Sequence, residues 1–236
     1  MVNSAFPITF GITAVAYAER SGTAQPRAYI VRMLRPFLLS LAGLAALAAP
    51  VRAQEVAEGQ AEADYHAWLA KSPAARAQVI AFKQFLGMEK VEDVLPTWQL
   101  VRTASMWREC AGPRFEVAPF AEWQHVAKTL RFVKNHVQPV LGEVEALSGY
   151  RNAELNRCAR GAPESAHRHF YALDLTPLRP VSREGMIRSL CAIHGFRGAG
   201  YDIGLGFYSG RRFHVDSKGF RKWGPDGKGA TSPCNA

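Results

Sequence analysis

The sequence predicts an α+β fold, in which a small antiparallel sheet is flanked by helices and preceded by a helical N-terminal region. Three patterns support this prediction. Residues 120–140 have the periodicity of a helix with one buried face. Several short apolar segments follow, separated by glycine and turn residues, as in the strands of an antiparallel sheet. Residues 54–87 are rich in Ala, Glu, Gln and Lys, which suits helices. Strands grouped around one or two helices define the α+β class.

The N-terminal region is expected to hold one or two amphipathic helices. Its apolar residues have helical spacing: Trp68, Val79, Phe82 and Phe85. Ser72 before Pro73 is typical of an N-cap and a first helical residue, which predicts a helix from Pro73 towards Phe85. For residues 94–117 we expect a short strand around Leu100 and a loop.

The helix at residues 120–140 is the clearest element. Its apolar residues recur at three- and four-residue steps: Trp123, Val126, Leu130, Val133 and Val137. Strands are expected in VEAL at residues 144–147, in ALDL at 172–175 and in FHVD at 213–216. A further helix is expected at residues 182–194, followed by a strand and turn in GLGFYSG, where Gly204 and Gly206 permit close backbone approach.

The first 53 residues are expected to be absent from the mature protein. Residues 33–53 have a basic start, a short apolar run and a small-residue end, which is the pattern of a secretory signal peptide. The apolar run is short for a membrane span, so we expect no stable membrane insertion and a periplasmic or secreted product. Gln54 is the expected first mature residue. We interpret Met33 as the true start and residues 1–32 as an over-extended N-terminus.

The expected mature chain is modestly basic. The full sequence carries a net charge of +9, but five of its 29 basic and one of its 20 acidic residues precede Gln54, so 24 minus 19 leaves +5. The basic residues are scattered, without the clustered Lys/Arg and interleaved aromatics of a nucleic-acid groove, so no nucleic-acid partner is expected. The charge suits an anionic envelope polymer as well as an ordinary soluble surface.

We divide the mature chain into a helical region at residues 54–115 and a compact domain at 116–236. All four cysteines lie in the expected mature chain, an even number in a compartment where disulfides persist. Three pairings are possible. We favour Cys110 with Cys158 and Cys191 with Cys234, because the second bridge would fix the C-terminal tail. A zinc site built from these thiols is disfavoured, because no two have a CxxC spacing.

Three residues are candidate ligands of one metal ion. His167 and Asp174 are seven residues apart, and a loop between them can return the imidazole over the carboxylate. In FHVD, His214 and Asp216 lie on the same face of a strand. Two imidazoles and a carboxylate suit Zn²⁺, and a catalytic zinc keeps its fourth position for water. For each histidine taken alone, a structural role is the alternative.

The order of four segments, SGYR, SAHRHFYALD, GLGFY and FHVD, resembles the zinc D-Ala-D-Ala carboxypeptidases and related murein endopeptidases. The signature of that family reads Ser-x-His-x-x-Gly-x-Ala-x-Asp, with a C-terminal His on a strand. Ser165, His167, Ala172 and Asp174 match it in place. The resemblance covers residues 141–223. It implies that His167, Asp174 and His214 are the zinc ligands.

The resemblance also implies a substrate-binding residue. In the family, an arginine in the SGYR segment meets the carboxylate of the substrate, which assigns this role to Arg151; a planar guanidinium binds a carboxylate bidentately. Phe170 departs from the signature, because it stands where the family usually has Gly and a bulky residue takes a positive φ only at a cost. His169 is the alternative ligand, or a partner of one, because it follows His167 by two residues.

The sequence offers more than one candidate for the group that transfers protons. Many relatives have an acid three residues before the final His, where this sequence has Arg211. Asp216 is our first candidate for catalysis, with Asp202 and His169 behind it. Asp216 can equally orient His214, because metal-bound imidazoles usually need a partner on their other nitrogen.

The resemblance implies an exported zinc peptidase that hydrolyses peptide bonds of peptidoglycan, either as a carboxypeptidase or as an endopeptidase. Its partners would be peptidoglycan peptides. The stereochemistry of the bond and the oligomeric state stay open. The alternative is a non-catalytic, zinc-containing module that binds the cell wall, which Arg211 and Phe170 favour.

Overall fold

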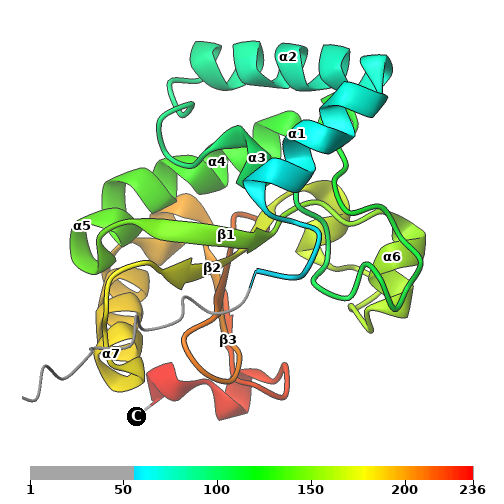
Figure 1. Ribbon diagram of the computed structural model, residues 1–236. Coiled ribbons are helices and arrows are strands. Elements are labelled where there is room, and N and C mark those ends of the chain that lie inside the picture. The colour runs from blue at the N-terminus through cyan, green and yellow to red at the C-terminus, as the bar shows by residue number, and fades with distance from the viewer. Residues whose placement is uncertain (1–55, 236) are drawn as a thin grey trace, which may run out of the picture. The chain divides into compact units, whose positions relative to one another are not determined.

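The computed structural model describes residues 56–235 (Figure 1). The expected N-terminal extension at residues 1–32 and the signal peptide at 33–53 lie outside the described residues and stay predictions. Within residues 56–235, no helix has the length and apolar character needed to cross a membrane.

Three helices form the N-terminal region: α1 (Glu62–Lys71), α2 (Pro73–Met88) and α3 (Thr97–Leu100). The predicted start of α2 is confirmed, because the Ser72 side chain accepts a hydrogen bond from the Ala75 N–H and Pro73 opens the helix. The strand expected around Leu100 is wrong. Leu100 ends α3 and is fully buried, and the only strand-like pairing nearby within the described residues is a single bridge between Arg102 and Phe115.

The central helix follows the predicted periodicity. It runs through η1 (Phe120–Glu122), α4 (Trp123–Phe132), the π-turn η2 (Val133–Val137) and α5 (Gln138–Leu141). The Gln138 N–H bonds Val133 O, five residues back, immediately before Pro139, whose nitrogen has no hydrogen to donate. The buried face of α4 packs on the sheet, and α2 packs on α4. Figure 1 shows the resulting order of sheet, central helix and N-terminal helices.

The sheet has five strands in the order β1-β2-β4-β3-β5. Their bounds are β1 (Val144–Ser148), β2 (Ala172–Pro177), β3 (Gly204–Phe207), β4 (Phe213–Asp216) and β5 (Arg221–Trp223). The first four pair antiparallel, as expected, whereas β5 pairs parallel to β3. The other helical segments are α6 (Ala153–Cys158), η3 (Ala166–His169), α7 (Arg183–Ile193), η4 (His194–Gly198), η5 (Ala199–Tyr201), η6 (Gly229–Thr231) and η7 (Pro233–Asn235).

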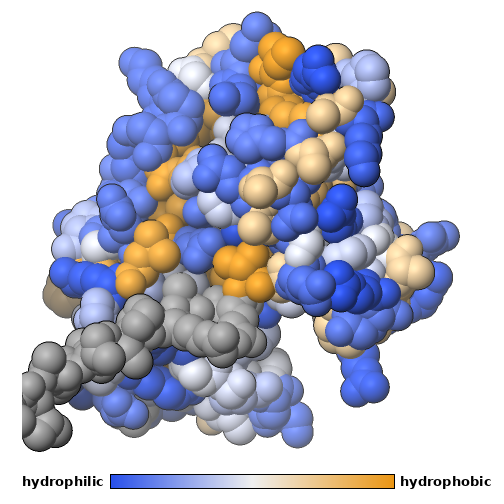
Figure 2. All heavy atoms as spheres, in the orientation of Figure 1, coloured by the Kyte–Doolittle hydropathy of each residue, from blue (hydrophilic) through white to orange (hydrophobic). Residues whose placement is uncertain are grey.

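A buried arginine joins the N-terminal segment to the sheet. Arg102 is 1% exposed and donates to Glu145 Oε1 at 3.0 Å, to Ala146 O at 2.7 Å and to Gln60 O at 2.9 Å. Removing either charge of this pair would leave the other unpaired in the core. The view in Figure 2 shows a mostly hydrophilic surface with separate apolar groups, one of them over α2 at the top.

Two disulfides have the favoured pairing, Cys110–Cys158 and Cys191–Cys234. The first fastens the segment after α3 to the end of α6. The second fastens the C-terminal η7 to α7.

Replacing Cys110 and Cys158 together by serine should reduce the free energy of unfolding by about 4 kcal/mol, because a bridge across 48 residues restricts the unfolded chain by about that amount. Chemical denaturation of the parent protein and of the double variant measures the difference in the free energy of unfolding. The pair Cys191 and Cys234 closes a loop of 43 residues and should lose a similar amount. A loss below about 1 kcal/mol in both double variants would contradict this account.

Candidate metal centre

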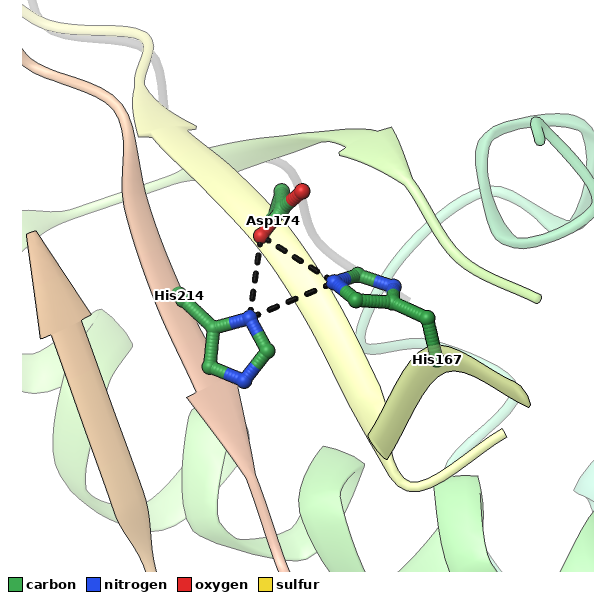
Figure 3. Close-up of side chains that lie close together, drawn as sticks. All are labelled: His167, Asp174 and His214. Carbon is green, nitrogen blue, oxygen red and sulfur yellow. Dashed lines mark hydrogen bonds and ion pairs between the residues drawn. The ribbon is translucent and has the colours of Figure 1, made fainter. Parts of the chain in front are cut away.

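The three predicted ligands converge at the junction of β2, β4 and η3. In the antiparallel pairing of β2 with β4, Asp174 lies directly opposite His214, so both side chains project from the same face of the sheet. His167 reaches them from η3, the short helical turn that the Ser165 hydroxyl caps by accepting from the His167 N–H. Figure 3 shows the three side chains directed toward one another.

The facing atoms form a nearly equilateral triangle. His167 Nε2 lies 3.2 Å from His214 Nδ1 and 3.3 Å from Asp174 Oδ1. His214 Nδ1 lies 3.1 Å from Asp174 Oδ1. All three residues are buried, at most 4% exposed. A tetrahedral zinc ion about 2.0–2.1 Å from each ligand separates its ligand atoms by about 3.3 Å, so the triangle fits such an ion.

Hydrogen bonds on the outer nitrogens leave the facing nitrogens as acceptors. His167 Nδ1 lies 2.7 Å from Gly149 O, a carbonyl that only accepts, so this nitrogen carries the proton. His214 Nε2 lies 2.8 Å from Asp216 Oδ2 and is held in the same way. Two neutral imidazoles therefore direct lone pairs at each other and at a carboxylate, an arrangement that a cation satisfies.

The surroundings of the centre favour a neutral His167 and an ionised Asp174. Burial and the neighbouring Arg151 lower the pKa of His167 to about 4. Burial alone would raise the pKa of Asp174, but His167 and Arg212 hold it well below its ordinary value. In the absence of metal, hydrogen bonds to Asp174 and Asp216 outweigh burial and raise the pKa of His214.

Asp216 contacts the far side of His214. Its Oδ2 also accepts from Arg221 Nη2 at 2.7 Å, and its Oδ1 accepts from Arg221 Nη1 at 2.9 Å and from the Lys218 N–H at 2.8 Å. These bonds occupy both oxygens away from the triangle. Of the two roles considered for Asp216, the contacts favour orienting His214.

The other candidates for proton transfer lie elsewhere. Asp202 pairs with Lys128 at 2.7 Å on the surface. His169 Nδ1 pairs with Glu122 Oε1 at 3.2 Å, and His169 is not a member of the group formed by His167, Asp174 and His214.

Gly204 and Gly206 permit the close approach expected of them. A Cβ at Gly204 would lie 2.3 Å from Asp216 Oδ2, and a Cβ at Gly206 would lie 2.0 Å from the Trp223 ring. The first glycine leaves room for the bond between Arg221 and Asp216. The second lets the Trp223 ring lie beside His214, with ring centroids 5.2 Å apart.

Two arginines hold the outer oxygen of Asp174. Arg151 Nη2 and Arg212 Nη2 each lie 2.6 Å from Asp174 Oδ2, and the Tyr208 hydroxyl donates to Asp174 Oδ1 at 2.9 Å. The sequence analysis named Arg151 as a substrate-binding residue, which stays a prediction, and it missed Arg212 and Tyr208. The alternation that placed His214 and Asp216 on one face also places Arg212 there, so the signal was present.

Phe170, which stands where the family signature has glycine, adopts a left-handed conformation with φ of 52°. It is 1% exposed, and its ring packs against Phe82 of α2 and Tyr150, with centroids 5.8 and 6.2 Å away. A positive φ costs roughly 1–2 kcal/mol for a residue with a Cβ. Burial of the ring offsets that cost and stabilises the left-handed conformation at this position.

A pocket of about 510 Å³ opens over the centre. His167 and His214 line it, together with Arg151, Tyr208 and Trp223. The centre is therefore accessible from one side while its ligands stay buried.

The structure is an α+β domain with a buried His-Asp-His group that can hold a metal ion. Residues 100–216 match the family described as Peptidase M15, and the part of the chain that carries the centre belongs to this family. The resemblance to the zinc D-Ala-D-Ala carboxypeptidases is thereby confirmed. No curated protein and no solved structure matches the chain.

Replacing Phe170 by glycine should destabilise the protein by about 2–3 kcal/mol, because losing a buried phenyl ring costs about 3–5 kcal/mol and relief of the strained backbone returns about 1–2 kcal/mol. Phe170→Ala is the matched control. It loses the ring but keeps the strain, so it should be less stable than the glycine variant by about 1 kcal/mol. Urea denaturation compares the three proteins. A glycine variant more stable than the parent would show that strain dominates.

The metal-free protein should lose stability as the pH falls from about 6.5 to about 4, because over this range the unfolded chain binds a proton at His167 that the folded state does not. The raised pKa of His214 acts in a separate window: its contribution is complete below about 6.5 and is lost as the pH rises through the folded value. Denaturation of chelator-treated protein across this range tests the prediction. In His167→Gln, the free energy of unfolding should depend less steeply on pH. A residual dependence should remain from His194, whose pKa burial also lowers. An identical pH dependence of stability in the parent protein and in His167→Gln would contradict the assignment of this effect to His167.

Proposed function

We propose that the protein is an exported zinc peptidase that hydrolyses peptide bonds of peptidoglycan. The observation that carries this proposal is the convergence of His167 Nε2, Asp174 Oδ1 and His214 Nδ1 within a region that belongs to the peptidase M15 family. The pocket above these atoms gives a peptide access to them. The two disulfides support a place outside the cytoplasm, in the periplasm or beyond.

Zinc, when bound, supplies a Lewis acid and lowers the pKa of a water molecule towards neutrality. The protein's residues contribute orientation and charge. Gly149 O and Asp216 fix the two imidazoles so that His167 Nε2 and His214 Nδ1 face the centre. Arg151 lines the pocket and offers guanidinium N–H groups to a substrate carboxylate.

Tyr208 is our candidate for the group that stabilises charge on the reacting carbonyl oxygen. Its hydroxyl borders the centre, 2.9 Å from Asp174 Oδ1, and its ring lines the pocket. A hydroxyl at that position can donate to an oxygen as negative charge develops there. This role suits Tyr208 better than Asp216, both of whose oxygens are occupied.

A zinc-containing module that binds the cell wall without cutting it is the second candidate. Arg211 stands where many relatives have an acid, and the nearest acid in sequence, Asp216, holds His214 instead. Binding of peptidoglycan peptides without turnover would establish this function.

Digestion of crosslinked peptidoglycan by the zinc-loaded protein separates the two candidates. A peptidase should release shortened or uncrosslinked muropeptides that mass spectrometry detects. The variant Asp174→Asn, which should bind zinc weakly, serves as the control. If the parent protein binds zinc stoichiometrically and leaves every muropeptide intact, the enzyme proposal is wrong.

The ligand assignment has its own test. His167→Ala should reduce zinc affinity by at least about 100-fold, because it removes one of three protein ligands. His169→Ala should leave zinc affinity unchanged, because His169 pairs with Glu122 instead. Competition with a chelating dye measures the zinc affinity of both variants. The reverse result would move the site to His169.

A further inference from the structure

We infer that the end segment, residues 229–235 with η6 and η7, supports the metal centre through β5. The Cys191–Cys234 bridge fixes the end segment to α7, the end segment fixes β5, and β5 orients a candidate zinc ligand, His214. Residues of β5 and of the end segment are therefore positioning residues of the centre. This support serves a peptidase and a non-catalytic, zinc-containing module alike.

Two side chains of β5 act on His214. Arg221 donates to both oxygens of Asp216, at 2.9 and 2.7 Å, and Asp216 in turn holds His214 Nε2 at 2.8 Å. The ring of Trp223 contacts the rings of His214 and Tyr208, with centroids 5.2 and 5.3 Å away. A shift of β5 would therefore disturb the orientation of His214 through two contacts at once.

The sheet alone holds β5 weakly. The strand has three residues, and among the strands of residues 56–235 it pairs only with β3, at the edge of the sheet. The residues opposite its two ends are Gly204 and Gly206, which have no side chains to pack against it. So short an edge strand makes few hydrogen bonds with its neighbour. The position of β5 therefore depends on contacts from elsewhere as well.

The end segment supplies such contacts, because η6 packs on β5. A Cβ at Gly224, immediately after β5, would lie 2.2 Å from Thr231 O. A Cβ at Gly229 would lie 3.3 Å from Lys222 O, so the two backbones are close at both places. Lys222 Nζ also donates to Cys234 O at 2.9 Å. Backbone and side-chain contacts thus join β5 to the end segment.

The disulfide holds the end segment in place. Cys234 of η7 is bridged to Cys191 of α7. Helix α7 is anchored in the core by Met186 and Leu190, which are at most 1% exposed. In the end segment itself, only Ser232 is buried. With so little burial of its own, the end segment depends on the bridge to stay on β5.

Open space separates α7 from β5 beside the bridge. A pocket of about 330 Å³ is lined by residues of both elements, among them Cys191, Arg221 and Lys222. Because α7 and β5 do not pack directly against each other over this area, the end segment and its bridge span the gap. Loss of the bridge would leave β5 without this connection to the core.

The test compares two double variants, each of which lacks one disulfide. Replacing Cys191 and Cys234 by serine removes the inferred support. Replacing Cys110 and Cys158 by serine is the matched control, because the two bridges span similar separations, 43 and 48 residues. Competition with a chelating dye measures zinc affinity at a temperature at which circular dichroism shows both variants to be folded. The first variant should lose zinc affinity about 10-fold or more, as for contacts that orient metal ligands, and the control should lose less.

Co²⁺ in place of zinc gives a second measurement, because its visible absorption depends on the geometry of its ligands. The spectrum should change in the variant without Cys191 and Cys234 and should stay that of the parent protein in the control. A loss of stability alone would not change the spectrum of the folded protein.

Lys222→Met tests the same support with both disulfides intact. It removes the bond to Cys234 O and should lower zinc affinity by a smaller factor than loss of the bridge does. Lys228→Met is the matched control, because it removes the same charge at an exposed position of the turn after β5. Its zinc affinity should equal that of the parent protein.

Equal losses of zinc affinity in the two double variants would overturn the inference, because they would reflect general destabilisation. Unchanged zinc affinity and an unchanged Co²⁺ spectrum without Cys191 and Cys234 would also overturn it. If that variant does not fold, equal zinc affinities of Lys222→Met and Lys228→Met would contradict the inferred support. Losses confined to the variants of the bridge and of Lys222 would support it. None of these outcomes depends on cleavage of peptidoglycan, so the peptidase proposal can fail separately.

Discussion

The site depends on one strand pairing, the register that sets Asp174 of β2 opposite His214 of β4. Because side chains alternate along a strand, a slip of one residue would turn these ligands into the core and bring apolar residues to the pocket. The residues on the opposite face prevent the slip. Leu173, Leu175, Phe213 and Val215 are fully buried and belong to the main core. The hydrophobic core therefore fixes the geometry of a polar site.

Each candidate ligand is also hydrogen-bonded through an atom that does not belong to the triangle of facing atoms. Gly149 O holds His167, Asp216 holds His214, and two arginines hold the outer oxygen of Asp174. Such partners keep the facing atoms in place before a metal arrives, which lowers the cost of forming the site. They also bear on the two roles considered for Asp216, because its bonds to His214 and Arg221 favour the role of orienting His214. Among the polar residues discussed, Tyr208 and Arg151 line the pocket over the centre and are the candidates for contact with substrate.

The sequence predicted the parts of this arrangement that depend on local order. The spacing of His167 and Asp174, the alternation in FHVD and the helical periodicity at 120–140 each arise within a few residues. The missed features depend on distant contacts. Leu100 entered a helical turn because α3 packs on β1, and Gln99 Oε1 accepts from the Ala146 N–H. Phe170 kept a left-handed backbone because Phe82 and Tyr150 bury its ring, which no local rule reveals.

The N-terminal region contributes to the site through three contacts, one from α2 and two from the segment that follows α3. Phe82 of α2 packs on Phe170, in the turn that joins His167 to β2. Arg102 bonds β1 and accepts through its carbonyl from the Gly149 N–H, and Gly149 O in turn holds His167. Ser105 accepts from Arg212, and both residues line a second pocket that shares Arg151 and Tyr208 with the pocket over the centre. The Cys110–Cys158 bridge then fastens this segment to α6, a few residues after Arg151. The geometry of the candidate site thus depends on residues that lie well before His167 in the sequence, from Phe82 to Ser105.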